Sequence, residues 1–168
     1  MKLVICEKPS VGAAVAAALG VTGKKDGYIE NDKYIISWCI GHLVQLSEAA
    51  AYGEQYRKWS YDSLPILPQE WQYTVAADKG KQFKILKDLM HRADVSEVVN
   101  ACDAGREGEL IFRFVYHQAG CKKPFTRLWI SSMENEAIRS GFDNLKDGRE
   151  YDALYHSALC RAKADWLI

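Results

Sequence analysis

The sequence predicts an α/β fold with a mostly parallel sheet covered by helices on both faces. Short apolar runs alternate along the chain with segments of helical spacing, and this order is typical of strand–helix–strand units. The first run, "KLVIC" at residues 2–6, is rich in β-branched residues and suits a strand buried on both faces. With 168 residues, the chain is long enough to bury one substantial core.

A helix is expected directly after this first strand. Pro9 and Ser10 form a helix-start signal, a run of alanines extends the helix, and Gly20 ends it. Residues 27–43 are predicted to form a hairpin that turns at Asn31, with "YIISWCI" as its second strand.

The remaining elements follow the same alternation. Strands are predicted at residues 73–77, 96–102 and 125–130, and helices at 79–93, 106–120, 133–145 and from 151 onward. The last helix has no stop signal before the end of the chain, so the sequence is interpreted as a fragment cut inside an element.

Residues 47–72 are predicted to be a long ordered loop inserted into this alternation. The segment is rich in tyrosine and tryptophan, and we expect these rings to pack the loop against the sheet. Arg57 and Lys58 lie among the aromatic residues, so stacking on single-stranded nucleic acid is the alternative.

Composition excludes several classes of protein. Basic and acidic residues are equal at 22 each, so net charge gives no indication of nucleic-acid binding, although a local patch can still bind phosphate. The five cysteines are odd in number and show no CxxC spacing, which argues against a disulfide framework or zinc site and favours a reducing cytoplasm. The apolar run near the N-terminus is too short for a signal peptide or a membrane span.

Acidic residues follow two of the predicted strands. Glu7 comes directly after residues 2–6, and Asp103 closes the strand at 96–102. Ligands of open α/β sheets bind beyond the carboxyl ends of strands, so these two acids, together with one at a neighbouring helix start, converge if the strands are neighbours. An ordinary helix N-cap or turn is the alternative role for Asp103.

Two further acids lie in the first turn of the predicted helix at 106–120. Helical spacing places Glu107 at the head of the apolar stripe that faces the sheet, where a carboxylate needs a partner or a metal. Glu109 falls on the opposite face, four residues before Arg113, and is interpreted as a solvated residue in a helix ion pair. Stabilisation of the helix dipole is the alternative role for Glu107.

The neighbours of these acids suit phosphate chemistry. Mg²⁺ prefers oxygen ligands and commonly uses one or two carboxylates together with substrate phosphate. Lys8 and Arg106 each adjoin an acid, where they could contact phosphate or neutralise the acids as ion-pair partners. Gly105 and Gly108 allow close backbone approach. His42 follows a strand and is either a hydrogen-bonded structural residue or a catalytic one.

Four segments together carry a family resemblance. "LVICEKPSVGAAVA", "IGHLVQL", "ACDAGREGELIFR" and "RLWISSMENEAIRSGF" resemble, in family order, the N-terminal Toprim domain of type IA DNA topoisomerases, most like bacterial topoisomerase III. The resemblance implies a Rossmann-like Toprim domain at residues 1–150 with an inserted hairpin and loop. It also implies that residues 151–168, including "ALCRAKADWLI", begin the following helical domain, which is truncated here.

The resemblance also implies a magnesium site. Glu7 matches the first acid of the family, Asp103 the first Asp of its DxDxE motif, and Glu107 the Glu of that motif. Gly105 departs from the pattern because it stands where the motif has its second Asp. One ion is therefore expected rather than two.

The implied chemistry is the transient breakage of single DNA strands. Lys8 matches the residue that contacts the scissile phosphate, and His42 is placed in the cleft region, which favours a catalytic role for it. In the family, a tyrosine attacks one strand to form a 5′-phosphotyrosyl link, the other strand passes through, and the ends are rejoined without a nucleotide cofactor. The expected partners are single-stranded or underwound DNA and, for the full-length protein, a helicase.

The nucleophile is missing from this sequence. None of the nine tyrosines lies in a context that matches the family's catalytic tyrosine, which belongs to a later domain. The chain alone is therefore expected to be inactive. The alternatives are a stand-alone Toprim nuclease or primase-like protein, which would act alone, and a metal-free DNA-binding module, which would not respond to Mg²⁺.

Overall fold

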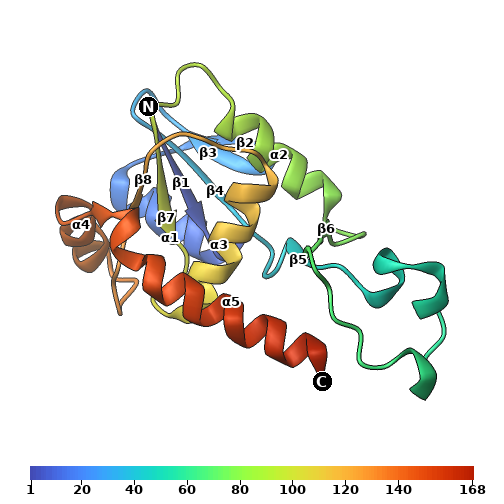
Figure 1. The fold of residues 1–168 in the computed structure, drawn as a ribbon. Coiled ribbons are helices and arrows are strands. Elements are labelled where there is room, and N and C mark those ends of the chain that lie inside the picture. Colours follow the sequence, from blue (N-terminus) through green and yellow to red (C-terminus); the bar gives the residue numbers. More distant parts are fainter.

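Four parallel strands form the centre of a seven-stranded sheet in the computed structural model, which describes residues 1–168 (Figure 1). The strands are β1 (Lys2–Cys6), β2 (Gly23–Lys25), β3 (Tyr28–Glu30), β4 (Tyr34–Trp38), β7 (Glu97–Ala101), β8 (Phe125–Arg127) and β9 (Lys146–Asp147). Their order is β2-β3-β4-β1-β7-β8-β9, and β4, β1, β7 and β8 run parallel. Antiparallel pairs form both edges of the sheet. The predicted α/β fold is confirmed.

Strand β1 lies at the centre because its apolar run is buried on both faces. Leu3 and Ile5 point into one core, whereas Val4 and Cys6 point into the other. In the register of the sheet, Val4 lies between Ile36 of β4 and Val99 of β7. Because both faces of β1 are covered by apolar cores, the first polar residue after it falls at the carboxyl edge of the sheet.

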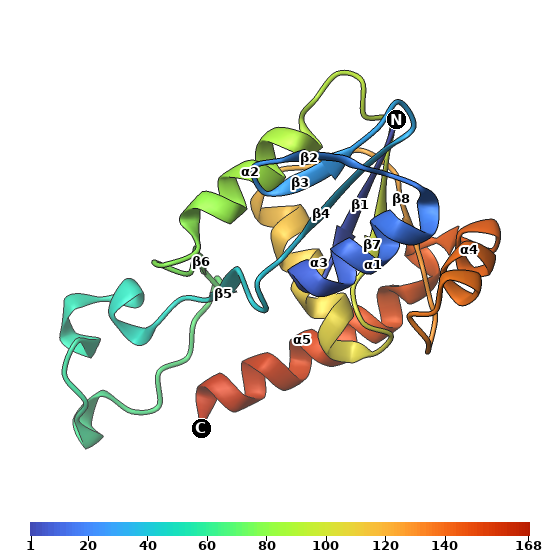
Figure 2. The ribbon, with the colours of Figure 1, turned by 180° about the vertical axis from the view of Figure 1, so that it is seen from behind.

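Helices cover each face of the sheet. Helices α1 (Pro9–Leu19) and α4 (Asn135–Asp143) pack on one face, which Figure 2 brings to the front. Helices α2 (Gly80–Met90) and α3 (Arg106–Gln118) pack on the other, and α5 (Asp152–Leu167) lies across the outer side of α3. The start of α1 at Pro9 and its end at Gly20, which is left-handed with φ 70°, are as predicted.

The predicted hairpin is also confirmed. Asn31 forms its turn by accepting hydrogen bonds from the backbone N–H groups of Lys33 and Tyr34, at 2.8 and 2.7 Å. By contrast, the strand predicted at residues 73–77 does not join the main sheet. It forms β6 (Tyr73–Val75), which pairs with β5 (Val44–Leu46) in a separate two-stranded sheet.

The β5–β6 pair forms the base of an arm, residues 47–72, that extends away from the body of the molecule (Figure 1). The arm contains three short 3-10 turns, η1 (Ala49–Tyr52), η2 (Glu54–Tyr56) and η3 (Tyr61–Ser63). Its rings do not pack against the sheet, so that prediction is wrong. Tyr52 and Trp71 pack on Trp166 of α5, whereas Trp59 and Tyr61 remain 71% and 80% exposed.

Glu109 is fully buried, at 0% exposure, and the prediction that it is solvated is wrong. Its carboxylate accepts hydrogen bonds from Asn100 Nδ2 at 2.9 Å and from Arg113 Nε at 3.1 Å. Arg127 Nε lies 2.7 Å from the same carboxylate, but its N–H is not aligned for a hydrogen bond. The predicted Glu109–Arg113 pair therefore exists, but α5 covers it, with Asp152 2.8 Å from Arg113 Nη1.

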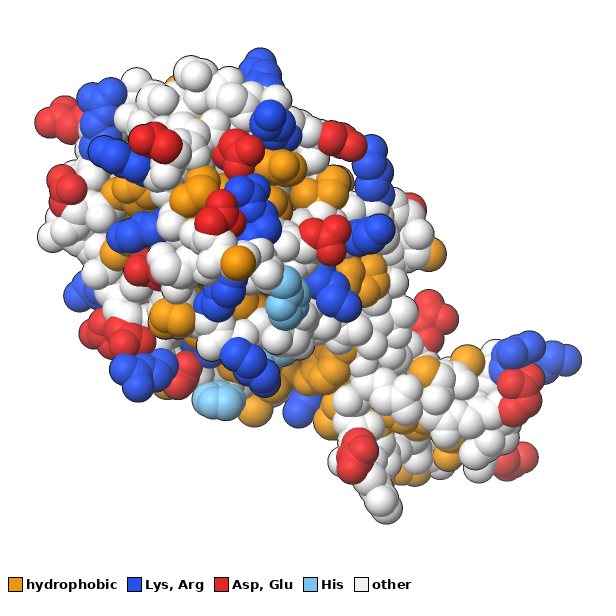
Figure 3. Space-filling view, turned by 90° about the horizontal axis from the view of Figure 1, so that it is seen from above, with side chains coloured by type: hydrophobic (Ala, Val, Ile, Leu, Met, Phe, Trp, Pro, Cys, Tyr) orange, Lys and Arg blue, Asp and Glu red, His pale blue; other side chains and the backbone are white.

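The prediction that Glu107 faces the sheet is also wrong. Its side chain is 69% exposed, because the first turn of α3 lies at the edge of the sheet, beyond the last residue of β7. All five cysteines are free in the structure. No helix in the structure combines the length and the apolar character that a membrane span requires. Figure 3 shows acidic and basic side chains interspersed on the face of the molecule seen from above.

Replacing Glu109 with glutamine is predicted to lower the free energy of unfolding by about 3 to 5 kcal/mol. The change keeps the shape of the side chain but leaves Arg127 buried without an opposite charge. Thermal or urea unfolding of the purified chain measures the loss. The control is Lys81→Ala, which removes an exposed ion pair with Asp26 and should change stability by less than about 1 kcal/mol. Equal stability of the Glu109→Gln variant and the wild type would contradict the prediction.

Candidate active site

Two carboxylates meet at the carboxyl edge of the sheet because β1 and β7 are neighbours. Cys6 and Ala101, the last residues of these strands, are paired in register. Glu7 follows β1 directly, and Asp103 lies in the turn between β7 and α3. The backbone N–H of Asp103 donates a hydrogen bond to Glu7 Oε1 at 3.3 Å. The predicted convergence of these two acids is confirmed.

The electrostatics of this pair favour a cation. Partial burial raises the pKa of Glu7, and the adjacent Asp103 carboxylate raises that pKa further, whereas Lys8 lowers it. Two ionised carboxylates this close repel each other, and a divalent cation between them would relieve the repulsion.

Close backbone approach fixes the position of the turn that carries Asp103. A Cβ atom added at Gly108 would overlap the carbonyl oxygen of Asp103 and lie 3.0 Å from its backbone nitrogen. Helix α3 therefore passes directly against this turn, as the sequence suggested for Gly108. Gly105 differs, because a Cβ there would meet no atom within 4 Å.

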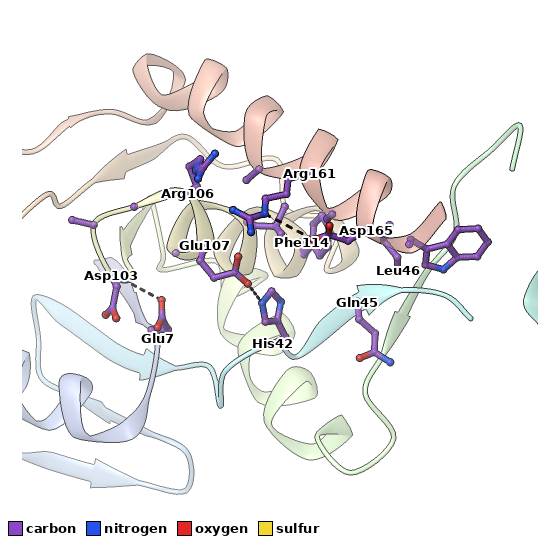
Figure 4. A pocket seen from close by; sticks show the side chains of 17 residues that line it. Glu7, His42, Gln45, Leu46, Asp103, Arg106, Glu107, Phe114, Arg161 and Asp165 are labelled. Atoms are coloured by element: carbon purple, nitrogen blue, oxygen red, sulfur yellow. Dashed lines mark hydrogen bonds and ion pairs between the residues drawn. The ribbon is translucent and has the colours of Figure 1, made fainter. Parts of the chain in front are cut away.

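A cleft of 840 Å³ opens beside the carboxylate pair (Figure 4). Five of the predicted residues line it: Glu7, His42, Asp103, Arg106 and Glu107. Side chains of α5, including Arg161 and Asp165, form another wall (Figure 4), and Trp166 of the same helix also lines the cleft. The cleft thus lies between the carboxyl edge of the sheet and the last helix.

Glu107 and His42 form a second pair within the cleft. Glu107 Oε1 contacts His42 Nε2, and the backbone carbonyl of His42 accepts a hydrogen bond from Lys79 Nζ at 3.3 Å. Figure 4 shows this pair apart from the Glu7–Asp103 pair, in the middle of the cleft. The three carboxylates predicted to bind one ion are therefore not gathered in a single cluster. Nowhere in the structure do three His, Cys, Asp or Glu side chains lie close enough to hold a metal.

The two predicted basic residues lie on different sides of Asp103. Lys8 lines a neighbouring groove of 570 Å³ together with Ser10, Asp103 and Ile130. Arg106 lines the main cleft, but its side chain points away from the Glu7–Asp103 pair (Figure 4). Asp103 borders both the groove and the cleft. A phosphate bound beside Asp103 would therefore lie next to the groove lined by Lys8 and the cleft lined by Arg106.

Some residues of the site were not identified from the sequence. Arg161 and Trp166 belong to α5, which was interpreted only as the start of another domain. Trp166 Nε1 donates to the carbonyl of Ser47 at 2.9 Å and so joins α5 to the arm. Arg127, which donates to the carbonyl of Asp103, was also missed, because a lone arginine at a strand end gives no signal of its own.

The sheet has helices on both faces, and its paired carboxylates lie at one edge. These features define a class of protein, the α/β domains with an acidic site at the carboxyl ends of parallel strands. A family model described as "Toprim domain" matches residues 2–133. The chain belongs to the Toprim domain family.

Similar proteins point to one branch of this family. The chain is 46% identical over 166 residues to proteins named DNA topoisomerase 3 from Bacillus licheniformis and from Bacillus subtilis, with 99% of the chain covered. A protein of the same name from Bacillus cereus is 48% identical. The chain spans 23% of the length of these relatives.

A solved structure supports the fold. Full-length topoisomerase I from Thermotoga maritima superposes with a TM-score of 0.55 at 20% identity, covering 86% of this chain and 21% of that protein. At this level of identity the similarity concerns the fold alone.

The substitution Gly108→Ala is predicted to destabilise the chain by about 1 to 3 kcal/mol, because the methyl group forces α3 and the Asp103 turn apart. The matched control is Gly80→Ala at the start of α2, where the methyl group has open space on a helical backbone and stability should change little. Thermal unfolding of both variants measures the difference. Equal melting temperatures for the two variants would show that the close approach at Gly108 is not a constraint.

Proposed function

We propose that this chain is the N-terminal, Mg²⁺-binding Toprim domain of a type IA DNA topoisomerase of the topoisomerase III kind. The observation that carries the proposal is the pairing of Glu7 with Asp103 at the carboxyl edge of the sheet, in a chain 46% identical to DNA topoisomerase 3 proteins. The full-length protein would break single DNA strands transiently, pass another strand through the break, and rejoin the ends through a 5′-phosphotyrosyl intermediate.

The proposed division of the chain places the Toprim domain at residues 1–150 and the start of a following helical domain at 151–168. Helix α5 makes up most of the second part, and its face toward the cleft carries Arg161 and Trp166. In this arrangement the cleft lies between the two domains. The second domain therefore contributes one wall of the site.

Glu7, Asp103 and Glu107 are the proposed Mg²⁺ ligands. The carboxylate oxygens suit a hard cation, and the repulsion between Glu7 and Asp103 favours one. Glu107 would join them by leaving His42, which lies across the same cleft. A single ion fits best, because Gly105 adds no carboxylate. Bound Mg²⁺ would position the scissile phosphate and the 3′ end of the broken strand.

The chain's own residues have distinct proposed roles around the phosphate. Lys8, next to Glu7 in sequence, would contact a phosphate oxygen from the groove that borders Asp103. Arg106 would do so from the rim of the main cleft. His42, paired with Glu107, would hold or transfer a proton within the cleft. The attacking tyrosine would come from another part of the full-length protein.

The proposed partners follow from the same chemistry. DNA is the substrate, in single-stranded or underwound form, because the reaction acts on one strand at a time. A helicase that unwinds DNA is the proposed partner of the full-length protein. The proposed location is the cytoplasm, where buried free thiols such as Cys6 and Cys102 remain reduced.

Mg²⁺ titration of the 168-residue chain, followed by amide chemical shifts, tests the metal site. The wild type should show saturable shifts at residues 7 and 103, and Glu7→Gln should weaken binding at least about tenfold by removing one of the two paired carboxylates. The control is Asp88→Asn, an exposed acid on α2, which should bind as the wild type does. A wild-type chain without any shift at these residues would favour the metal-free DNA-binding alternative.

Plasmid relaxation tests the activity. The 168-residue chain should not relax supercoiled DNA, because it lacks the proposed nucleophile. In a full-length protein that carries this chain, Asp103→Asn should slow relaxation by about 100-fold or more through loss of charge at the metal site. Robust relaxation by the 168-residue chain would overturn the proposal, and Mg²⁺-dependent nicking by it would support the nuclease alternative.

A further inference from the structure

We propose that Arg127 is a positioning residue: it holds the Asp103 turn, residues 102–105, so that the Asp103 carboxylate stays beside Glu7. The inference rests on the proposed Mg²⁺ site and extends it to a buried side chain that would not touch the ion. Arg127 lies at the end of β8, where it is paired in register with Asn100 of β7, the strand that leads into the turn.

The guanidinium group of Arg127 binds the backbone of this turn directly. Its Nη2 donates to the carbonyl oxygen of Asp103 at 2.8 Å, and its Nη1 donates to the carbonyl of Cys102 and to Asn100 Oδ1. No backbone N–H donates to either of the two carbonyls. A buried carbonyl without a hydrogen-bond donor is energetically unfavourable. Arg127 therefore supplies the donors that the N–H groups of a neighbouring strand supply elsewhere in a sheet.

The backbone of Asp103 is therefore held on both sides. Its N–H donates to Glu7 Oε1, and its carbonyl accepts from Arg127 Nη2. These two bonds join β1, the turn and β8 through one residue. Removing the Arg127 contact would free one side of the peptide and let the carboxylate move relative to Glu7. Supporting groups of this kind typically account for a 10- to 100-fold effect on metal affinity.

The guanidinium group of Arg127 is itself held in place, as a group that positions the Asp103 turn must be. The side chain is 0% exposed, and its Nε lies 2.7 Å from Glu109 Oε1. The rings of Trp129 and Tyr151 stack on each other, and Arg127 Cζ lies 5.0 and 6.0 Å from their centroids. Arg127 is thus held by an anion and two aromatic faces while its outer nitrogens bind the turn.

Arg113 offers a matched comparison within the same ion cluster. It shares the Glu109 carboxylate, but its other nitrogens bind Asp152 Oδ1 at 2.8 Å and the carbonyl of Gly148 at 3.0 Å. These partners lie on the α5 side, away from the Asp103 turn. A change at Arg113 therefore disturbs the cluster without freeing the turn.

The test compares Arg127→Lys with Arg113→Lys in the 168-residue chain. Lysine keeps the charge beside Glu109 but lacks the planar fork that reaches two carbonyls at once. Arg127→Lys should weaken Mg²⁺ binding by about 10- to 100-fold in calorimetry and speed amide hydrogen exchange at residues 102–105. Arg113→Lys should lose stability, yet bind Mg²⁺ within about twofold of the wild type and leave exchange at the turn unchanged.

The outcomes separate this inference from the proposed function. Wild-type Mg²⁺ affinity and wild-type exchange in Arg127→Lys would overturn the positioning role. If the wild type itself fails to bind Mg²⁺, the proposed metal site is wrong, and the exchange comparison still decides whether Arg127 holds the turn. If Arg127→Lys does not fold, Arg127→Met leaves the Glu109 carboxylate bound by Arg113 and Asn100, and it should show the same faster exchange at residues 102–105.

Discussion

The buried carboxylate of Glu109 joins two strands of the sheet to helix α3. It contacts Asn100 of β7, Arg113 of its own helix α3 and Arg127 of β8. Arg113 extends the connection to Asp152 at the start of α5. Buried charges are unfavourable unless each finds its partner, so this set of contacts fixes how the helix layer sits on the sheet and how α5 lies over it.

The candidate site depends on that arrangement. Glu7 and Asp103 meet because β1 and β7 are neighbours, and the turn carrying Asp103 is confined between α3 at Gly108 and the side chain of Arg127. The other wall of the cleft is α5, whose start is bound to the Glu109 cluster and whose end is joined to the arm by Trp166. The buried cluster around Glu109 thus helps to fix the positions of both walls of the cleft.

The sequence was sufficient for features that depend on local signals, such as the start of α1 at Pro9 and the hairpin turn at Asn31. It also predicted the meeting of Glu7 and Asp103, because strand ends share an edge. The helical periodicity of residues 106–120 could not show that α5 would cover α3, so Glu109 was wrongly predicted to be solvated. Nor could a composition rich in aromatics tell which rings of the arm pack on α5 and which, like Trp59, stay exposed.

Anomalous diffraction from crystals soaked in Mn²⁺ would test most directly the claim that the Glu7–Asp103 pair is a cation site. Mn²⁺ accepts the same oxygen ligands as Mg²⁺ and can be located by its own signal. The account predicts one peak between the carboxylates of Glu7 and Asp103, with Glu107 within reach of the same ion. A peak bound only by His42 and Glu107, or none at the carboxyl edge of β1 and β7, would contradict it.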